Sequence, residues 1–278
     1  MKYIIILFLL LTGTAYAQEN YDLSTALMRS TFKLEGPCFT GTSTGTCFII
    51  GKPSKNIPNF SYYVLVTAAH VLKDIQSDTA ILNLRKKEND AYSKVPYPIK
   101  IRSDGKPLWK EYSNADIAVM YVDLKDIDIS LVTINLLAKD EDLKKLEVRP
   151  GDELFVLGFP LGSEANDAGF PILRSGSIAG YPILPTKATK TMLIDFEVFK
   201  GNSGGPVFLI SQNRYYEGSF HISEINRYII GLVMQEYKYT EQIKTLFETK
   251  TTDYPLKLGV VIHASLIKEA IDSLPQLE

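Results

Sequence analysis

The chain has 278 residues, of which 45% are hydrophobic and 22% charged, and its formal net charge at pH 7 is −2. This nearly neutral balance argues against nucleic acid as a partner and gives no sign of a patch for anionic membranes. No internal repeat, low-complexity tract or long linker interrupts the chain.

The first residues have the pattern of an export signal. Lys2 is the only charge before residue 19, residues 3–11 are all apolar, and AYA at 15–17 fits a cleavage site with small residues. The apolar run is shorter than the roughly 20 residues that span a bilayer. We therefore predict a signal peptide over 1–17 and a mature chain that begins at Gln18. We expect it to lack a membrane anchor and to reside in the periplasm or outside the cell.

Two cysteines follow in the mature chain. Cys38 and Cys47 flank the run FTGTSTGT, which is typical of a hairpin turn. Opposed hairpin positions can approach closely enough for a disulfide, which an oxidising compartment favours. We expect a Cys38–Cys47 bridge, and two buried thiols are the alternative. Two ligands cannot form a structural zinc site alone, and no histidine is placed to help, so we predict neither metal nor cofactor.

Most of the chain has the pattern of β-strands. Apolar or alternating runs separated by turn residues predict strands at 45–50, 61–69, 116–122, 153–158, 191–199, 204–210, 227–235 and 258–263. Residues 265–274 place their apolar side chains on one helical face, and 139–146 can form a short helix. An all-β chain of this length fits either one large sandwich or two barrels.

A histidine and an aspartate occupy matching places beside two of these strands. His70 closes the run VLVTAAH, where two alanines leave space beside the imidazole. Asp116 leads the apolar run DIAVM and is expected to be partly buried. Because a buried carboxylate needs a partner, an imidazole N–H is a natural one. In isolation, each residue can equally be structural.

The run GNSGGP at 201–206 places a serine among three glycines, directly before an apolar strand. Ser203 needs a base to take its proton and backbone N–H groups to bind an oxyanion. Glycines allow the tight turn that crowds N–H groups around the serine oxygen. The order His70, Asp116, Ser203 therefore indicates an acyl-transfer triad.

TAAH, DIAV and GNSGGP resemble the three signatures of chymotrypsin-fold serine proteases. The asparagine before the serine, the segment 151–162 and the run SGSIAG at 175–180 are similar to bacterial members. These include secreted trypsin-like peptidases and the protease domain of high-temperature-requirement proteases. The resemblance implies two six-stranded antiparallel β-barrels over 18–140 and 141–278, a short C-terminal helix, and a cleft between the barrels.

The resemblance also implies a function. His70, Asp116 and Ser203 would hydrolyse peptide bonds in polypeptide substrates through an acyl-enzyme, and the N–H groups of Gly201 and Ser203 would bind the oxyanion. In place of the aspartate that pairs with a new N-terminus in animal enzymes, this chain has Asn202. We expect Asn202 to hold the loop by hydrogen bonds, so that no second cleavage is needed.

Substrate contacts are expected beside the strand that ends at Glu236. By resemblance, the residues near the primary pocket are Glu197, Met234, Gln235 and Glu236. The two glutamates favour a basic side chain before the cut if they face the pocket, and have no such effect if they face solvent. The polar, tyrosine-rich segments 211–226 and 237–256 are expected to rim the cleft.

Two other functions fit parts of the pattern. Gly201-x-Ser203-x-Gly205 also matches the nucleophile elbow of α/β-hydrolase esterases, with Asp253 and His263 as partners. That fold needs a helix after the serine and βαβ alternation, whereas 206–210 has the pattern of a strand. A catalytically silent binding protein with the protease fold is the second alternative.

Overall fold

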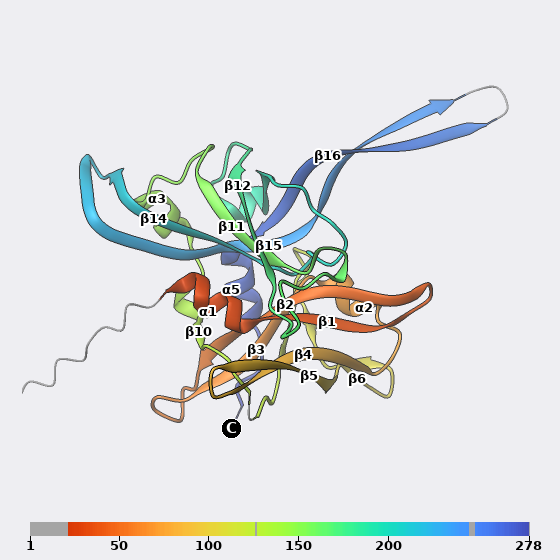
Figure 1. Cartoon of the computed structure of the whole chain (residues 1–278). Helices are drawn as coiled ribbons and strands as arrows, with labels where there is room; N and C mark the ends of the chain where they lie inside the picture. The colour runs from red at the N-terminus through yellow and green to blue at the C-terminus, as the bar shows by residue number, and fades with distance from the viewer. Residues whose placement is uncertain (1–21, 126, 245–247, 278) are drawn as a thin grey trace, which may run out of the picture.

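The computed structural model describes residues 22–125, 127–244 and 248–277 (Figure 1). The predicted signal peptide lies outside the described residues. The first half contains α1 (Leu23–Ser30), β1 (Thr31–Cys38), β2 (Gly41–Pro53), β3 (Ser61–Thr67), α2 (Ala69–Asp74), β4 (Thr79–Glu88), β5 (Ala91–Lys100), β6 (Arg102–Ser103), β7 (Lys106–Pro107), β8 (Lys110–Glu111), β9 (Ala118–Tyr121), β10 (Val132–Thr133) and the 3-10 helix η1 (Ile134–Leu136).

The second half begins with α3 (Asp140–Lys145), next to the predicted boundary at 140/141. It continues with β11 (Glu153–Gly158), the 3-10 helix η2 (Pro160–Gly162), β12 (Ile172–Ile178), α4 (Thr186–Thr189), β13 (Thr191–Asp195), β14 (Pro206–Tyr216), β15 (Ser219–Lys244), β16 (Thr249–His263) and α5 (Ala264–Asp272).

The sheet of the first half is built around β2 and β3, in the order β5-β4-β1-β2-β3-β9-β8, with β10 added beside β2. Residues 45–52 of β2 and 64–67 of β3 are buried in unbroken runs. Such runs mark strands covered on both faces. Helix α1 contributes to that cover, because Leu23 and Leu27 are fully buried in the same core.

The strands of the second half close into an antiparallel six-stranded barrel, in the order β11-β12-β13-β16-β15-β14. Its core is a separate apolar cluster that includes Val156, Ile194, Val207 and Val233. The described strands thus confirm an antiparallel β architecture, and this half matches the expected six-stranded barrel. The first half differs: its sheet has eight strands, includes one parallel pair, β10 with β2, and does not close.

Helix α5 follows the last strand of the barrel but packs on the first half. Its apolar face, Leu266, Ile267, Ala270 and Ile271, belongs to the core cluster of the first sheet. The ammonium of the buried Lys52 donates to the carbonyls of Ile271 and Leu274 at 3.0 and 3.2 Å. These are C-terminal carbonyls, which a helix leaves without partners of its own. The expected helix is therefore present, and it connects the barrel to the core of the first half.

The predicted disulfide is wrong. The β1–β2 hairpin turns at Phe39 and Thr40, so Cys38 pairs with Gly41, whereas Cys47 pairs with Phe32 deep in the sheet. The distance along β2 from Gly41 to Cys47 is roughly 20 Å, beyond the roughly 7 Å that a disulfide spans between Cα atoms. Both cysteines are free thiols, Cys38 half-buried and Cys47 buried. Most of the run between them, from Gly41 onwards, belongs to β2. Its Gly/Thr/Ser composition is typical of a turn, so a strand of this length was not predicted.

The described parts of the two tyrosine-rich segments extend strands. Residues 211–226 belong to the β14–β15 hairpin, and residues 237–244 and 249–256 belong to the outer parts of β15 and β16. Figure 1 shows this second ribbon projecting far from the barrel at upper right. Only its base, up to Thr240, reaches the cavity beside Ser203. The expectation that both segments rim the cleft is therefore met by this base alone.

Candidate active site

His70 and Asp116 are brought together by the ends of two paired strands. His70 is the second residue of α2, directly after β3, and Asp116 precedes β9, which pairs with β3. One carboxylate oxygen of Asp116 accepts from the His70 backbone N–H at 2.9 Å, and the other lies 2.5 Å from His70 Nδ1. Because a carboxylate accepts, Nδ1 carries the proton and Nε2 is left as the acceptor.

The charge of Asp116 is stabilised in this position. Burial by itself would raise the pKa of its carboxyl, but the hydrogen bonds and charge of His70 outweigh burial, and the pKa lies below its ordinary value. The carboxylate is therefore ionised at neutral pH. It fixes the imidazole tautomer and favours the imidazolium that forms when Nε2 takes a proton.

Ser203 faces the same cavity as His70, but its hydroxyl is engaged elsewhere. Ser203 Oγ donates to the backbone carbonyl of Met234 at 3.0 Å, and no hydrogen bond joins it to His70 in the described part of the chain. Met234 is the extra residue of a β-bulge in β15, between the paired residues Val233 and Gln235. Bulges redirect backbone groups and are frequent beside active sites. Catalytic hydrogen bonds are often absent before substrate binds.

The loop before Ser203 has the backbone of an oxyanion hole. The Asn202 N–H is used within the loop, donating to Phe199 at 3.1 Å, whereas among the described residues the N–H groups of Gly201 and Ser203 donate to no protein atom. Gly201 has φ +94°, and a Cβ there would lie 2.1 Å from the Phe159 carbonyl. Only glycine fits this position. The free N–H groups of Gly201 and Ser203 are those that the sequence predicts to bind an oxyanion, and that assignment stays a prediction.

Thr46 of β2 holds this loop from the first half of the molecule. Its buried hydroxyl donates to the Gly201 carbonyl at 2.6 Å and accepts from the Phe159 N–H at 3.2 Å. Its backbone N–H donates to the Ser203 carbonyl at 2.9 Å. Thr46 therefore contacts both residues of the predicted oxyanion hole. Sequence reasoning placed Thr46 in a predicted strand but missed this role, because the role depends on contacts with residues more than 100 positions away.

A second support comes from the segment between β11 and β12. The Leu161 N–H donates to the Lys200 carbonyl at 2.6 Å, which fixes the peptide that carries the Gly201 N–H. Glu164 ties this segment to the first sheet through ion pairs with Lys33 and Lys94, both at 2.7 Å. The oxyanion loop is thus supported by both halves of the molecule.

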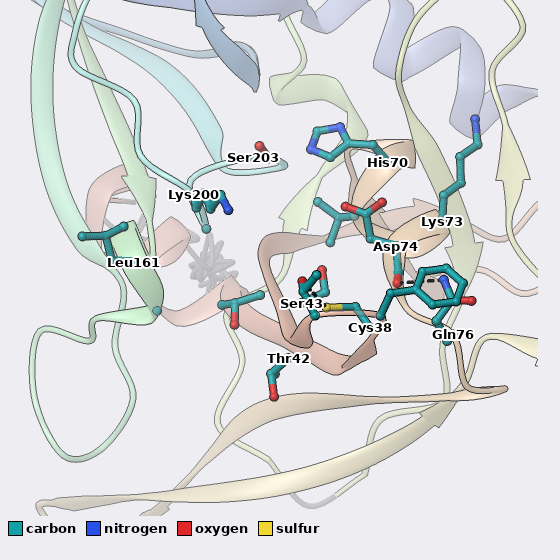
Figure 2. Close-up of a pocket in the computed structure, with 16 residues that line it drawn as sticks. Cys38, Thr42, Ser43, His70, Lys73, Asp74, Gln76, Leu161, Lys200 and Ser203 are labelled. Carbon is teal, nitrogen blue, oxygen red and sulfur yellow. Dashed lines mark hydrogen bonds between the residues drawn. The ribbon is translucent and has the colours of Figure 1, made fainter. Parts of the chain in front are cut away.

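Two cavities meet at Ser203. The larger, about 910 Å³, is lined by His70, Ser203, the β1–β2 turn and Leu161. Figure 2 shows Ser203, Lys200 and Leu161 on one side of it, His70 and Lys73 on the other, and Cys38, Thr42 and Ser43 below. The smaller, about 480 Å³, is lined by residues 198–200, Ser203, residues 235–238 and Thr240. A polypeptide crossing Ser203 would therefore have space on both sides of the bond to be cut.

The residues predicted to contact substrate are only partly together. Gln235 and Glu236 line the smaller cavity, and Met234 contributes its carbonyl to Ser203. Glu197 does not line that cavity, and its carboxylate lies 3.7 Å from Lys257. The lysines 200 and 238 line the cavity together with Glu236. Two positive charges facing one negative charge do not favour a basic substrate side chain, so the charge argument for that preference fails.

The role expected for the Asn202 side chain is not seen. Asn202 is buried, but its side-chain nitrogen has no hydrogen-bond partner among the described residues. The loop is held instead through the Asn202 backbone, whose carbonyl accepts from Gly205 at 3.0 Å.

The esterase alternative has no support in the fold. The residues after Ser203 form β14 and not a helix, and the barrel is antiparallel. Asp253 lies on the projecting ribbon and bonds Thr240, whereas the buried His263 lies 3.1 Å from the Thr189 hydroxyl. His221 is stacked on Tyr216 in the β14–β15 hairpin. Neither of these histidines belongs to the site.

Comparison with known proteins identifies the family of this chain. The family model "trypsin-like peptidase domain" matches residues 45–215, which is more than half of the chain. The chain belongs to the trypsin-like peptidase family. Membership assigns it to the serine endopeptidases. The matched region contains all three residues of the predicted triad. No curated protein matches the chain.

Solved structures of bacterial and other proteases are similar at low identity. The serine endoprotease from Yersinia pestis has a TM-score of 0.47 and 14% identity over 89% of this chain, which spans 63% of that protein. Protease Anisep from Arthrobacter nicotinovorans has a TM-score of 0.48 and 12% identity over 89% of this chain and 98% of its own. The thermostable serine protease AL20 from an extremophilic microorganism has a TM-score of 0.45 and 12% identity over 87% of this chain and 95% of its own.

The family assignment rests on the family model, because these structural similarities are too low to carry it. None of the described helices is long and apolar enough to cross a membrane. In the same residues, no group of three or more His, Cys, Asp and Glu side chains is arranged to hold a metal ion.

Proposed function

We propose that this protein is an exported serine endopeptidase that cleaves polypeptides through His70, Asp116 and Ser203. The observation that supports this most directly is the pairing of His70 with Asp116 at 2.5 Å, on the wall of a cavity that Ser203 also lines. Pairing through Nδ1 leaves His70 Nε2 as a base on the serine side.

The reaction begins when the Ser203 hydroxyl turns from the Met234 carbonyl towards His70. His70 Nε2 takes the proton as Ser203 Oγ attacks the peptide carbonyl, and the oxyanion is bound by the N–H groups of Gly201 and Ser203. His70 then gives the proton to the leaving amine, and the C–N bond breaks. Water attacks the acyl-enzyme in the same way, with His70 again as the base, and Ser203 is restored.

Export is proposed on the basis of residues 1–17. If the signal is removed after Ala17, protein recovered outside the cytoplasm begins at Gln18. Intact-mass measurement tests this directly, and finding Met1 on exported protein would contradict it.

The catalytic proposal is tested by labelling with a fluorophosphonate probe, which reacts with an activated serine. Wild-type protein is expected to form one adduct, on Ser203, and to digest unfolded casein. Ser203→Ala is expected to lose the adduct and at least about 100-fold of the proteolysis. Ser43→Ala is the matched control, because Ser43 lines the same cavity but lies outside the proposed triad, and it should keep both.

The silent binding protein would give a different result. Folded wild-type protein that forms no adduct and cleaves no unfolded protein would contradict peptidase activity and favour that alternative.

A further inference from the structure

The ribbon formed by the outer parts of β15 and β16 has an open edge that starts at the candidate site. Strand β15 pairs with β14 as far as Leu232 and with β16 from Gly231 onwards. Beyond Val233, therefore, its second edge pairs with no strand among the described residues. Met234, the first residue on this edge, is the one whose carbonyl accepts from Ser203.

The edge continues outwards from the smaller cavity, past a register shift between Tyr237 and Lys238 in the pairing with β16. Residues 235–238 and Thr240 line the cavity together with Ser203, and β15 runs on to Lys244. We call residues 237–244 and their partners 249–258 the arm. The eight residues from 237 to 244 span about 25 Å of exposed strand edge.

One face of the arm carries an aromatic stripe, which we define as Tyr237, Tyr239, Ile243 and Tyr254. Tyr237, Tyr239 and Ile243 alternate along β15, so they share a face, and Tyr254 pairs with Tyr239 across the ribbon. The Tyr239 and Tyr254 rings are 6.3 Å apart. All four side chains are 44 to 58% exposed.

Proteins rarely expose a two-stranded ribbon that has an unpaired edge and apolar side chains on one face. A two-stranded hairpin is only marginally stable in water, and an unpaired edge with exposed apolar side chains attracts another strand. The arm is held by its own cross-strand contacts, among them Thr240 with Asp253 at 2.8 Å and Tyr254 with Glu241 at 3.1 Å. The arm is thus a folded ribbon in which one edge of β15 pairs with no other described strand, so that edge can accept the main-chain hydrogen bonds of another strand.

We propose that the arm binds the substrate itself, by adding an extended segment of the polypeptide to the open edge of β15. This inference rests on the proposed peptidase function and specifies its substrate class: unfolded chains with a long extended segment before the bond to be cut. Main-chain hydrogen bonds along β15 supply affinity, and the aromatic stripe selects apolar side chains at alternate positions.

Chain direction decides which side of the cut lies on the arm. Both neighbours of β15 run antiparallel to it, and a substrate strand added in the same sense runs inwards as β15 runs outwards. Its end at the site therefore continues into the scissile bond, and residues N-terminal to that bond lie along the arm. Segments C-terminal to the bond leave through the larger cavity and do not touch it.

The test compares peptides that share one site cleaved in unfolded β-casein. The core peptide has about four residues on each side of the cut, and two longer peptides add about eight residues before or after it, which match the arm in length. Binding is measured by fluorescence anisotropy on Ser203→Ala protein, and turnover is measured on active protein. The N-terminal extension is expected to tighten binding and raise kcat/KM by about 10-fold or more, while the C-terminal extension changes either by less than about 2-fold.

A shortened arm supplies the decisive variant. Replacing residues 241–252 with Asn-Gly joins the paired residues Thr240 and Asp253 by a two-residue turn and leaves the cavity lining in place. This variant should cleave the core peptide within about 2-fold of wild type, which also shows that it folds, and should lose most of the gain from the N-terminal extension. The double variant Tyr239→Ser, Tyr254→Ser should lose part of that gain without any change in chain length.

Four results would overturn the proposal or the function on which it rests. An N-terminal extension that gives no gain, or the same gain in the shortened variant, excludes the arm while leaving the peptidase function intact. An arm that instead dimerises the protein in sedimentation experiments, with no effect of peptide length, is a contact between copies of the chain. If the core peptide is neither cut nor bound, the proposed function fails first, and the fluorophosphonate result identifies that case.

Discussion

At the scale of single residues, the least expected feature is that Thr46, far from the triad in sequence, contacts both residues of the oxyanion loop. Its hydroxyl joins the Gly201 carbonyl to the Phe159 N–H, and its own N–H holds the Ser203 carbonyl. These bonds fix the Gly201–Asn202 and Ser203–Gly204 peptides, which adjoin the two peptides that carry the free N–H groups of Gly201 and Ser203. Thr46 is therefore a positioning residue.

Thr46→Val removes the hydroxyl with little change in shape. The Gly201 carbonyl and Phe159 N–H then lose a buried partner, and we expect kcat to fall by about 10- to 100-fold with KM nearly unchanged, less than the loss of an oxyanion donor itself. Thr46→Ser should restore most of kcat. The control is Thr31→Val, because the Thr31 hydroxyl is buried with no hydrogen-bond partner in the described residues. A purely structural role would lower stability in Thr46→Val and leave kcat unchanged.

His263 gives the protein a defined pH dependence of stability. Burial lowers its pKa from 6.5 to about 4, and the charge of Asp140 offsets this only in part. The folded state keeps the imidazole neutral, so this contribution is complete above pH 6.5 and is lost as pH falls towards 4. The free energy of unfolding should fall by about 2 kcal/mol between pH 8 and pH 5.

Urea unfolding of wild-type protein and His263→Gln across this range measures that contribution. The variant should lose most of the slope above pH 5, where most carboxylates have not yet begun to titrate. An identical slope in both proteins would show that the titrating group is another one.

At the scale of elements, the β1–β2 hairpin determines what its two cysteines can do. Cys38 is half-buried beside the turn, whereas Cys47 is fully buried opposite Phe32, and burial raises the pKa of the Cys47 thiol. A buried neutral thiol is a poor nucleophile.

We therefore expect a thiol reagent such as dithionitrobenzoate to modify one cysteine in folded protein and two in protein unfolded without reductant. Cys38→Ser should abolish the labelling of folded protein, while Cys47→Ser should leave it unchanged. If unfolded, unreduced protein shows no thiol at all, the chain has a disulfide and the hairpin register is wrong.

How far the sequence predicts these elements depends on how each is buried. The central strands β2, β3 and β11 have apolar runs that no loop would carry, and each triad residue lies at one end of an apolar run: His70 after β3, Asp116 before β9 and Ser203 before β14. Strands β4 and β5 were not predicted, because the outer end of β4, residues 86–88, is exposed and charged, and β5 is buried only at Ile99. Thr46 and Leu161 were missed because their roles depend on contacts between distant segments, which no local pattern encodes.

At the scale of the whole molecule, α5 makes the two halves a single unit. It continues directly from β16 of the barrel, yet its apolar face is buried in the core of the first sheet. Tyr112 adds a hydrogen bond from the first half to Glu269 of the helix. The halves are thus joined by a shared core, and they should unfold together.

Ile271→Ala removes a fully buried side chain from that shared core. We expect it to lower the free energy of unfolding by about 2–5 kcal/mol and to keep a single transition. Trp109, the only tryptophan, reports on the first half by fluorescence, and far-UV circular dichroism reports on both halves. Lys268→Ala on the same helix is the control, because its ion pair with Asp272 is exposed and should contribute at most about 1 kcal/mol. Two separated transitions would contradict the shared core.

The packing of α5 against the first half also has a consequence during synthesis. The first sheet can form its core early, but the Ser203 loop depends on Thr46 from that sheet, and the barrel is completed only by β16. Until β16 and α5 have emerged and folded, His70 and Ser203 are not held against one another. We therefore expect a growing or unfolded chain to have no assembled site, and thus no proteolytic activity, until β16 and α5 have folded.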